Sequence, residues 1–161
     1  GSGNVSVIDM ATNTVITTVT VGLTPEQGAV TPNGLFAYVA NSGSNTVSVI
    51  ATATNTVVGS PISVDQRPDF LTVSRDGASV FVPNQNSNSV FVISTASNTV
   101  TATISVGVNP TGVATTPPDI PIIPTLSDGA LLFLLAAMAA ALALRIVTRQ
   151  ASPPPRPPRA I

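Results

Sequence analysis

The chain has 161 residues with neither Cys nor His, and its seven acidic and six basic residues give a net charge of −1. All seven acidic residues precede position 129 together with two arginines, and the other four arginines follow it. This acidic front part lacks the basic surface of nucleic-acid-binding proteins, and the missing Cys and His remove the commonest metal ligands, general base and thiol nucleophile. We therefore expect no nucleic-acid partner, no metal ion, no cofactor and no catalytic residue.

The first 117 residues repeat with a period of 42 to 43 residues. Asn13-Thr14-Val15 returns as Asn55-Thr56-Val57 and as Asn98-Thr99-Val100. Each complete period holds four runs rich in β-branched residues, which in the first complete period lie near 28–31, 36–40, 46–50 and 56–64. Asn33-Gly34 and Asp76-Gly77 supply the positive φ angles that tight hairpin turns require. A four-stranded antiparallel unit that recurs at this interval is typical of a β-propeller blade.

The repeat therefore predicts an all-β fold over residues 1–117, in the form of a partial β-propeller. We expect a pair of strands first, then two complete blades near 28–64 and 70–106 that pack face to face. One further strand of the innermost type is expected at 112–116. These strands are too few to close a propeller ring.

Three motifs in the first complete period carry a resemblance to a known family. Tyr38-Val39-Ala40-Asn41 is followed by Asn45-Thr46-Val47-Ser48-Val49-Ile50 and then by Asn55-Thr56-Val57. This series resembles the YVTN-family β-propeller repeat. The resemblance implies the fold but not one function, because related propellers include surface-layer proteins, quinoprotein-like envelope proteins and some lactonases.

The C-terminal part has a different composition from the repeats. A proline-rich segment at 118–125 is predicted to be an extended stalk. Residues 129–144 carry no charge and consist mostly of Leu and Ala, which predicts one transmembrane α-helix at about 129–147, in contact with membrane lipid. Arg145 and Arg149 lie at the end of this span, so the positive-inside rule orients the Pro- and Arg-rich tail at 150–161 toward the cytoplasm and the repeats outside.

A second resemblance covers residues 122–149. Ile123, Pro124, Thr125, Leu126 and Ser127, followed by the apolar span and by Arg, resemble the IPTL-CTERM protein-sorting domain. The resemblance implies an exported protein of the bacterial cell envelope, which its tail anchors in the membrane with a single span. It also implies a partner, a processing enzyme of the exosortase type, and a protein that is released or attached to the cell surface after processing.

Two charged groups in the repeats are candidate functional residues. Asp65, Arg67 and Asp69 share one loop, and Arg75 and Asp76 flank a turn. A pair of carboxylates is able to do acid–base work, but solvated turn residues explain both groups better. The Asn-rich loops at 41–45 and 84–88 could bind a cation or a sugar, although Asx turns are the simpler interpretation.

Two classes of function remain open. The favoured one is an exported, envelope-anchored structural or binding module with an unknown propeller ligand, and not an enzyme. The alternative is a lactonase-like propeller enzyme whose active site lies in blades outside this sequence. His, Asp and Asn side chains that converge on the central channel of such blades would favour catalysis.

Overall fold

The computed structural model describes residues 2–116 of the chain. Its elements are β1 (Asn4–Asp9), β2 (Thr14–Thr20), β3 (Pro25–Val30), β4 (Phe36–Asn41), β5 (Thr46–Ala51), β6 (Thr56–Val57), β7 (Ile62–Ser63), β8 (Thr72–Val73), β9 (Ser79–Asn84), the 3-10 helix η1 (Gln85–Ser87), β10 (Ser89–Ser94) and β11 (Thr99–Ser105). Among these residues no helix is long and apolar enough to cross a membrane. The predicted stalk, sorting motif, transmembrane helix and tail lie outside the described residues.

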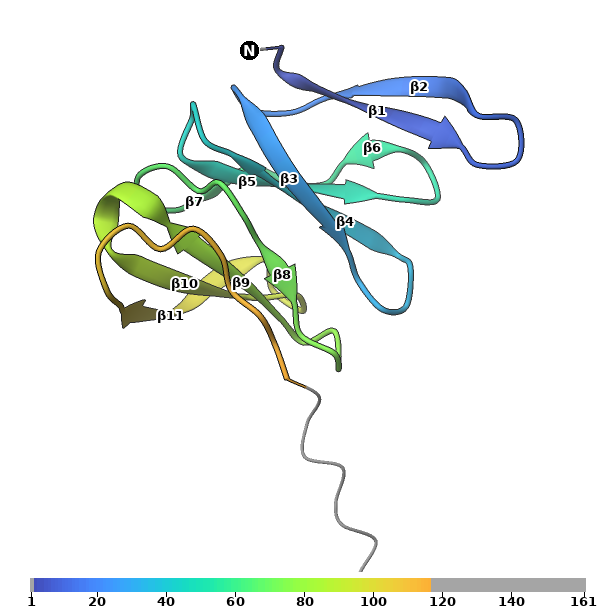
Figure 1. Cartoon of the computed structure of the whole chain (residues 1–161). Helices are drawn as coiled ribbons and strands as arrows, with labels where there is room; N and C mark the ends of the chain where they lie inside the picture. The colour runs from blue at the N-terminus through green and yellow to red at the C-terminus, as the bar shows by residue number, and fades with distance from the viewer. Residues whose placement is uncertain (1, 117–161) are drawn as a thin grey trace, which may run out of the picture. The chain divides into compact units, whose positions relative to one another are not determined.

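The strands form three antiparallel sheets that follow one another in chain order (Figure 1). The first blade consists of the hairpin β1–β2 alone. The second blade has the order β3-β4-β5, with β6 and β7 both paired to β5, and the third has the order β11-β10-β9-β8. The all-β fold and its antiparallel four-stranded sheets, as in the blades of a partial propeller, are confirmed.

The fourth strand of the second blade is divided into β6 and β7, whereas one continuous run was predicted at 56–64. The segment between Asn55 and Val64 is one residue longer than the equivalent segment between Asn98 and Val106. The amides of Val64 and Val106 nevertheless make equivalent hydrogen bonds, to the carbonyls of Asn45 and Asn88. The extra residue therefore cannot pair with β5, and the strand is interrupted near Gly59, which adopts a φ of +68°.

Residues 112–116, predicted as a further innermost strand, join no ladder. The strands at the equivalent position, β3 and β8, pair with β4 and β9, which in each case is the next strand along the chain. No described strand follows residue 116. Within residues 2–116, residues 112–116 therefore have no partner strand of this kind.

The main hydrophobic core lies between the second and third blades. Tyr38, Ala40, Val47 and Val49 of the second blade pack with a set from the third blade that comprises Leu71, Val80, Val82 and Ile93. Each fully buried Val or Ile contributes about 1.5–3 kcal/mol, so this interface contributes much of the stability of the repeats. A smaller cluster of Val19, Val39 and Ile50 joins the first and second blades.

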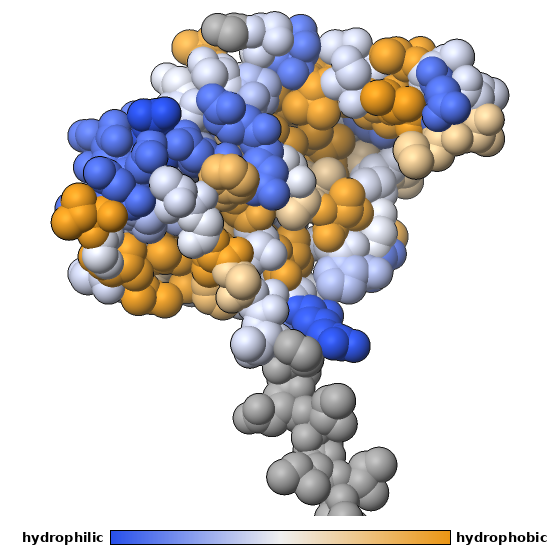
Figure 2. Space-filling view, in the orientation of Figure 1, coloured by the Kyte–Doolittle hydropathy of each residue, from blue (hydrophilic) through white to orange (hydrophobic). Residues whose placement is uncertain are grey.

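The outer faces of the first and third blades remain apolar and exposed. Ile8 and Val15 of the first blade are 54% and 59% exposed, and Ile104 of the third is 45% exposed. Figure 2 shows apolar residues on the visible surface of both blades. Since repeat units bury their apolar faces against neighbours, these are the faces on which further blades would pack.

Candidate functional site

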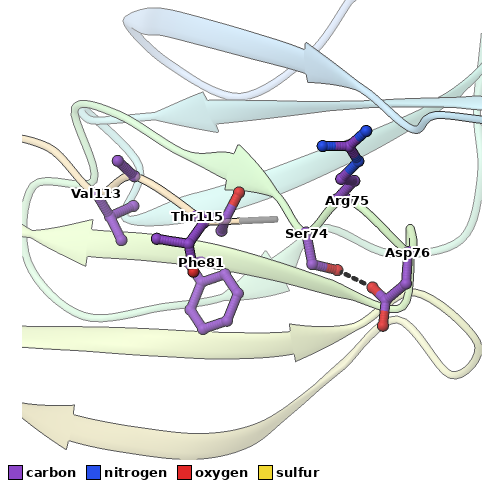
Figure 3. Close-up of a pocket in the computed structure, with 8 residues that line it drawn as sticks. Ser74, Arg75, Asp76, Phe81, Val113 and Thr115 are labelled. Carbon is purple, nitrogen blue, oxygen red and sulfur yellow. Dashed lines mark hydrogen bonds between the residues drawn. The ribbon is translucent and has the colours of Figure 1, made fainter. Parts of the chain in front are cut away.

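A pocket of about 350 Å³ lies where residues 113–116 pass beside the turn that follows β8. Ser74, Arg75 and Asp76 of the turn, Phe81 of β9 and residues 113–116 line it (Figure 3). The pocket contains the Arg75-Asp76 pair that the sequence singled out, and it adds Phe81.

The Ser74–Asp76 pair closes the turn between β8 and β9. The Ser74 hydroxyl donates to Oδ1 of Asp76, which also accepts a hydrogen bond of 3.0 Å from the amide of Ala78. The amide of Ser79 in turn donates to Oγ of Ser74 at 2.9 Å. The hydrogen bond from Ser74, together with that from Ala78, lowers the pKa of Asp76 below its usual value, which keeps the carboxylate ionised at neutral pH.

The second blade contains the same turn without a carboxylate. The Thr31 hydroxyl donates to Oδ1 of Asn33 at 2.7 Å, and the amides of Leu35 and Phe36 donate to Asn33 Oδ1 and Thr31 Oγ1. An amide thus takes the place of the Asp76 carboxylate in an equivalent network. The arrangement is therefore a device for closing turns, and it does not require a group that exchanges protons.

Arg75 and Phe81 are left as the groups that a ligand could contact. In Figure 3 the Arg75 guanidinium points away from the Ser74–Asp76 hydrogen bond. Arg75 forms no ion pair within residues 2–116. A guanidinium suits an anionic ligand, and an aromatic ring in the same pocket lining adds an apolar contact.

The second charged group lies in another pocket, of about 240 Å³, at the inner edges of the second and third blades. Arg67, Asp69 and Phe70 line it together with Glu26 and Gln27. Nε of Arg67 lies 3.3 Å from Oδ2 of Asp69, and the Arg67 side chain is 55% exposed, so this surface pair contributes little stability.

Sequence reasoning placed Asp65 with this group and missed Glu26. In the structure Asp65 does not line the pocket. Its carboxylate instead accepts a hydrogen bond from the amide of Gln66. Glu26 and Asp69 each follow a proline of the repeat, Pro25 and Pro68. This shared repeat position is the signal that could have identified Glu26.

The Asn-rich loops use their amides to hold neighbouring segments together. Oδ1 of Asn45 accepts a hydrogen bond from the amide of Arg67, and Oδ1 of Asn88 accepts one from the amide of Asn109, both at 3.0 Å. The side chains of Asn41 and Asn84 are fully buried. These contacts support the structural interpretation of the loops. Within the described part of the chain, no group of three or more acidic, His or Cys side chains is arranged to hold a metal ion.

The predicted sorting residues Ile123, Pro124, Thr125, Leu126 and Ser127 lie outside the described residues, as do Arg145 and Arg149. Their predicted roles in sorting and membrane orientation therefore rest on sequence alone.

Residues 32–119 match the YNCE-like β-propeller family, which is more than half of the chain. No curated protein matches the chain.

Several solved structures are similar. Hydrazine synthase from Kuenenia stuttgartiensis is 30% identical with a TM-score of 0.65, over 68% of this chain and 32% of that one. A functionally unknown protein from Desulfotomaculum acetoxidans is 24% identical with a TM-score of 0.59, over 70% and 37% of the two chains. The dihydro-heme d1 dehydrogenase NirN, in complex with DHE, is 19% identical with a TM-score of 0.64, over 73% and 26%. The chain thus spans about a third of the length of these structures, and the latter two show similarity of fold alone.

Proposed function

The chain belongs to the YNCE-like β-propeller family, and from this premise we propose that it is a structural or binding module of the bacterial cell envelope and not an enzyme. In this proposal the repeats face outward and present a ligand-binding surface. The C-terminal tail anchors the protein in the membrane and is the substrate of an exosortase-type enzyme.

The observation that carries the non-enzymatic part is the equivalence of two turns. Asp76 and Ser74 would be the candidates for acid–base or nucleophilic work in the 350 Å³ pocket, but Asn33 and Thr31 form the same hydrogen bonds in the second blade. Because the Asn33 amide makes the same hydrogen bonds in the equivalent turn, the Asp76 carboxylate has a structural role. The exposed Arg75 and the partly buried Phe81 remain for binding.

The envelope part of the proposal rests on the order of features along the tail. The motif Ile123 to Ser127 precedes an uncharged span, and Arg145 and Arg149 follow. Six Leu and one Phe at about −0.5 kcal/mol each favour insertion of this span by roughly 3.5 kcal/mol. The span is therefore apolar enough to act as an anchor.

The sorting role is tested by a double substitution that leaves the span untouched. The chain is expressed behind a secretory signal peptide in a bacterium that carries an exosortase, and its mass and membrane fraction are followed. Pro124→Ala with Thr125→Ala should stop processing while membrane association persists. If the double variant is processed as fully as the parent, the segment is an anchor only and the sorting proposal is wrong.

A further inference from the structure

The turn between β3 and β4 contains a chemically labile pair of residues. Asn33 is the only asparagine of the chain that a glycine follows. Asparagine is one of the thermolabile residues of proteins, and a following glycine has no side chain to hinder attack by its amide nitrogen. Asn33 and Gly34 are both exposed to solvent. Water therefore reaches both the side-chain amide and the main-chain nitrogen that can attack it.

A neighbouring blade does not cover a turn of this kind. The equivalent turn of the third blade has the second blade beside it, since a Cβ added at Gly77 would lie 3.3 Å from Cδ of Pro32. Asp76, the counterpart of Asn33, is nevertheless exposed. A blade that packs in the same way on the second blade therefore leaves Asn33 exposed as well.

Three hydrogen bonds hold the reacting groups in the folded turn. The Thr31 hydroxyl and the amide of Leu35 donate to Oδ1 of Asn33 at 2.7 and 3.0 Å. The amide of Gly34 donates to the carbonyl of Thr31 at 2.8 Å. For attack, the Gly34 nitrogen must give up the proton that it donates, and the Asn33 side chain must turn toward that nitrogen. The turn must therefore open before the two groups react.

We propose that Asn33 is a site of spontaneous covalent modification, and that opening of the β3–β4 turn sets its rate. The deprotonated nitrogen of Gly34 forms a bond to Cγ of Asn33. The bond from Cγ to Nδ2 breaks, and ammonia leaves with the proton that the Gly34 nitrogen has lost. Water then opens the resulting succinimide ring. Attack of water at Cγ gives aspartate, and attack at the main-chain carbonyl carbon of residue 33 gives isoaspartate.

The third blade shows the effect of the aspartate product. Asp76 stands at the position of Asn33, and its Oδ1 accepts the two equivalent hydrogen bonds. Aspartate at position 33 therefore keeps the turn closed and adds a negative charge to its surface. Isoaspartate instead inserts a methylene group into the main chain, which displaces the atoms that make these hydrogen bonds.

The rate is measured on the full chain in detergent micelles and on a synthetic peptide of residues 29–38, which has no folded turn. Both are incubated in the same mildly alkaline buffer, and liquid chromatography with mass spectrometry follows the two products at residue 33. We expect both products from the native chain. The peptide should react on the order of a hundredfold faster, because three net hydrogen bonds of about 1 kcal/mol each close the turn of the native chain.

The role of the turn is tested with matched variants. Thr31→Val removes the hydroxyl that donates to Asn33 and should speed modification of the native chain about fivefold, since one net hydrogen bond of about 1 kcal/mol is lost. Thr31→Ser keeps a hydroxyl and should react at the parental rate. Ser74→Ala removes the equivalent hydroxyl of the third blade and should leave the rate at Asn33 unchanged. The proposal is overturned if the native parent stays unmodified, if it reacts as fast as the peptide, or if Thr31→Val reacts no faster than Ser74→Ala.

Discussion

The hydrogen bond between Tyr38 and Asn98 allows a sharp test of how the blades hold together. Tyr38→Phe removes the hydroxyl but keeps the ring, and Phe81 shows that the equivalent position of the third blade accepts phenylalanine. The Tyr38 side chain is fully buried. Loss of one hydrogen bond should lower the free energy of unfolding by about 1 kcal/mol, which corresponds to a decrease of about 4 °C in Tm for a domain of this size.

The assay is urea or thermal unfolding of the full chain in detergent micelles, followed by circular dichroism. Asn98→Gly removes the acceptor and retains a residue suited to the φ of 54° at this position. If the two groups interact directly, the double variant should be less destabilised than the sum of the single variants, with a coupling energy of about 1 kcal/mol. Additive effects would refute the reasoning, because the two blades would then be held together without this bond.

The same residue provides a pH test. Burial raises the pKa of Tyr38 above its usual value of 10.0. The neutral phenol therefore stabilises the folded state fully below pH 10, and this contribution is lost as the pH rises through the folded pKa. Tyr38 is the only tyrosine of the chain and there is no Trp, so near-ultraviolet absorbance reports its ionisation alone. Equal midpoints for the folded and the urea-unfolded chain would contradict the burial of Tyr38.

Three further substitutions test other parts of the molecule. Thr24→Asn should stabilise the repeats by up to about 1 kcal/mol in urea unfolding. Thr24 has a φ of 52° that disfavours a β-branched side chain, and Asn109 occupies the equivalent position. No gain in stability would mean that the local contacts of Thr24 offset its strain. Asp76→Asn should leave the free energy of unfolding at neutral pH nearly unchanged, since Asn33 closes the equivalent turn. It should also reduce the loss of stability that the parent shows as the pH falls through the depressed pKa of Asp76. Strong destabilisation at neutral pH would show that the charge is required. Ala137→Arg should move the chain from the membrane to the soluble fraction, because a central Arg opposes insertion by about 2.5–3.5 kcal/mol; unchanged membrane association would contradict the predicted span.

The strands and turns were largely predictable because the repeat supplies the same evidence several times. Gly34 and Gly77 have φ angles of +72° and +74°, as the Asn-Gly and Asp-Gly signals indicated. The division of the fourth strand also had a signal, since the change of period from 42 to 43 residues coincides with Gly59-Ser60-Pro61. The regular repeat of four strands led to the prediction of a continuous strand in spite of this one-residue insertion.

Other features depend on contacts that no local pattern contains. Residues 112–116 resemble the innermost strands in sequence, but a strand needs a partner and none is described. The positive φ of Thr24 and Arg67 could not be predicted from residue type, because neither favours that conformation. The repeat position of Glu26 was visible in the sequence, but its place beside Arg67 and Asp69 depends on the packing of two blades.

The central claim, an anchored module whose repeats face outward, is tested most directly by the side of the membrane on which each end lies. The chain has no Cys, so single cysteines can be introduced by Ala53→Cys, in the exposed turn between β5 and β6, and by Ala160→Cys, in the tail. Both variants are expressed behind a signal peptide in a host without an exosortase, and intact spheroplasts are treated with a membrane-impermeant maleimide. The account predicts that Ala53→Cys is labelled in intact spheroplasts and that Ala160→Cys is labelled only after lysis. Labelling of both positions in intact spheroplasts, or of neither, would contradict it.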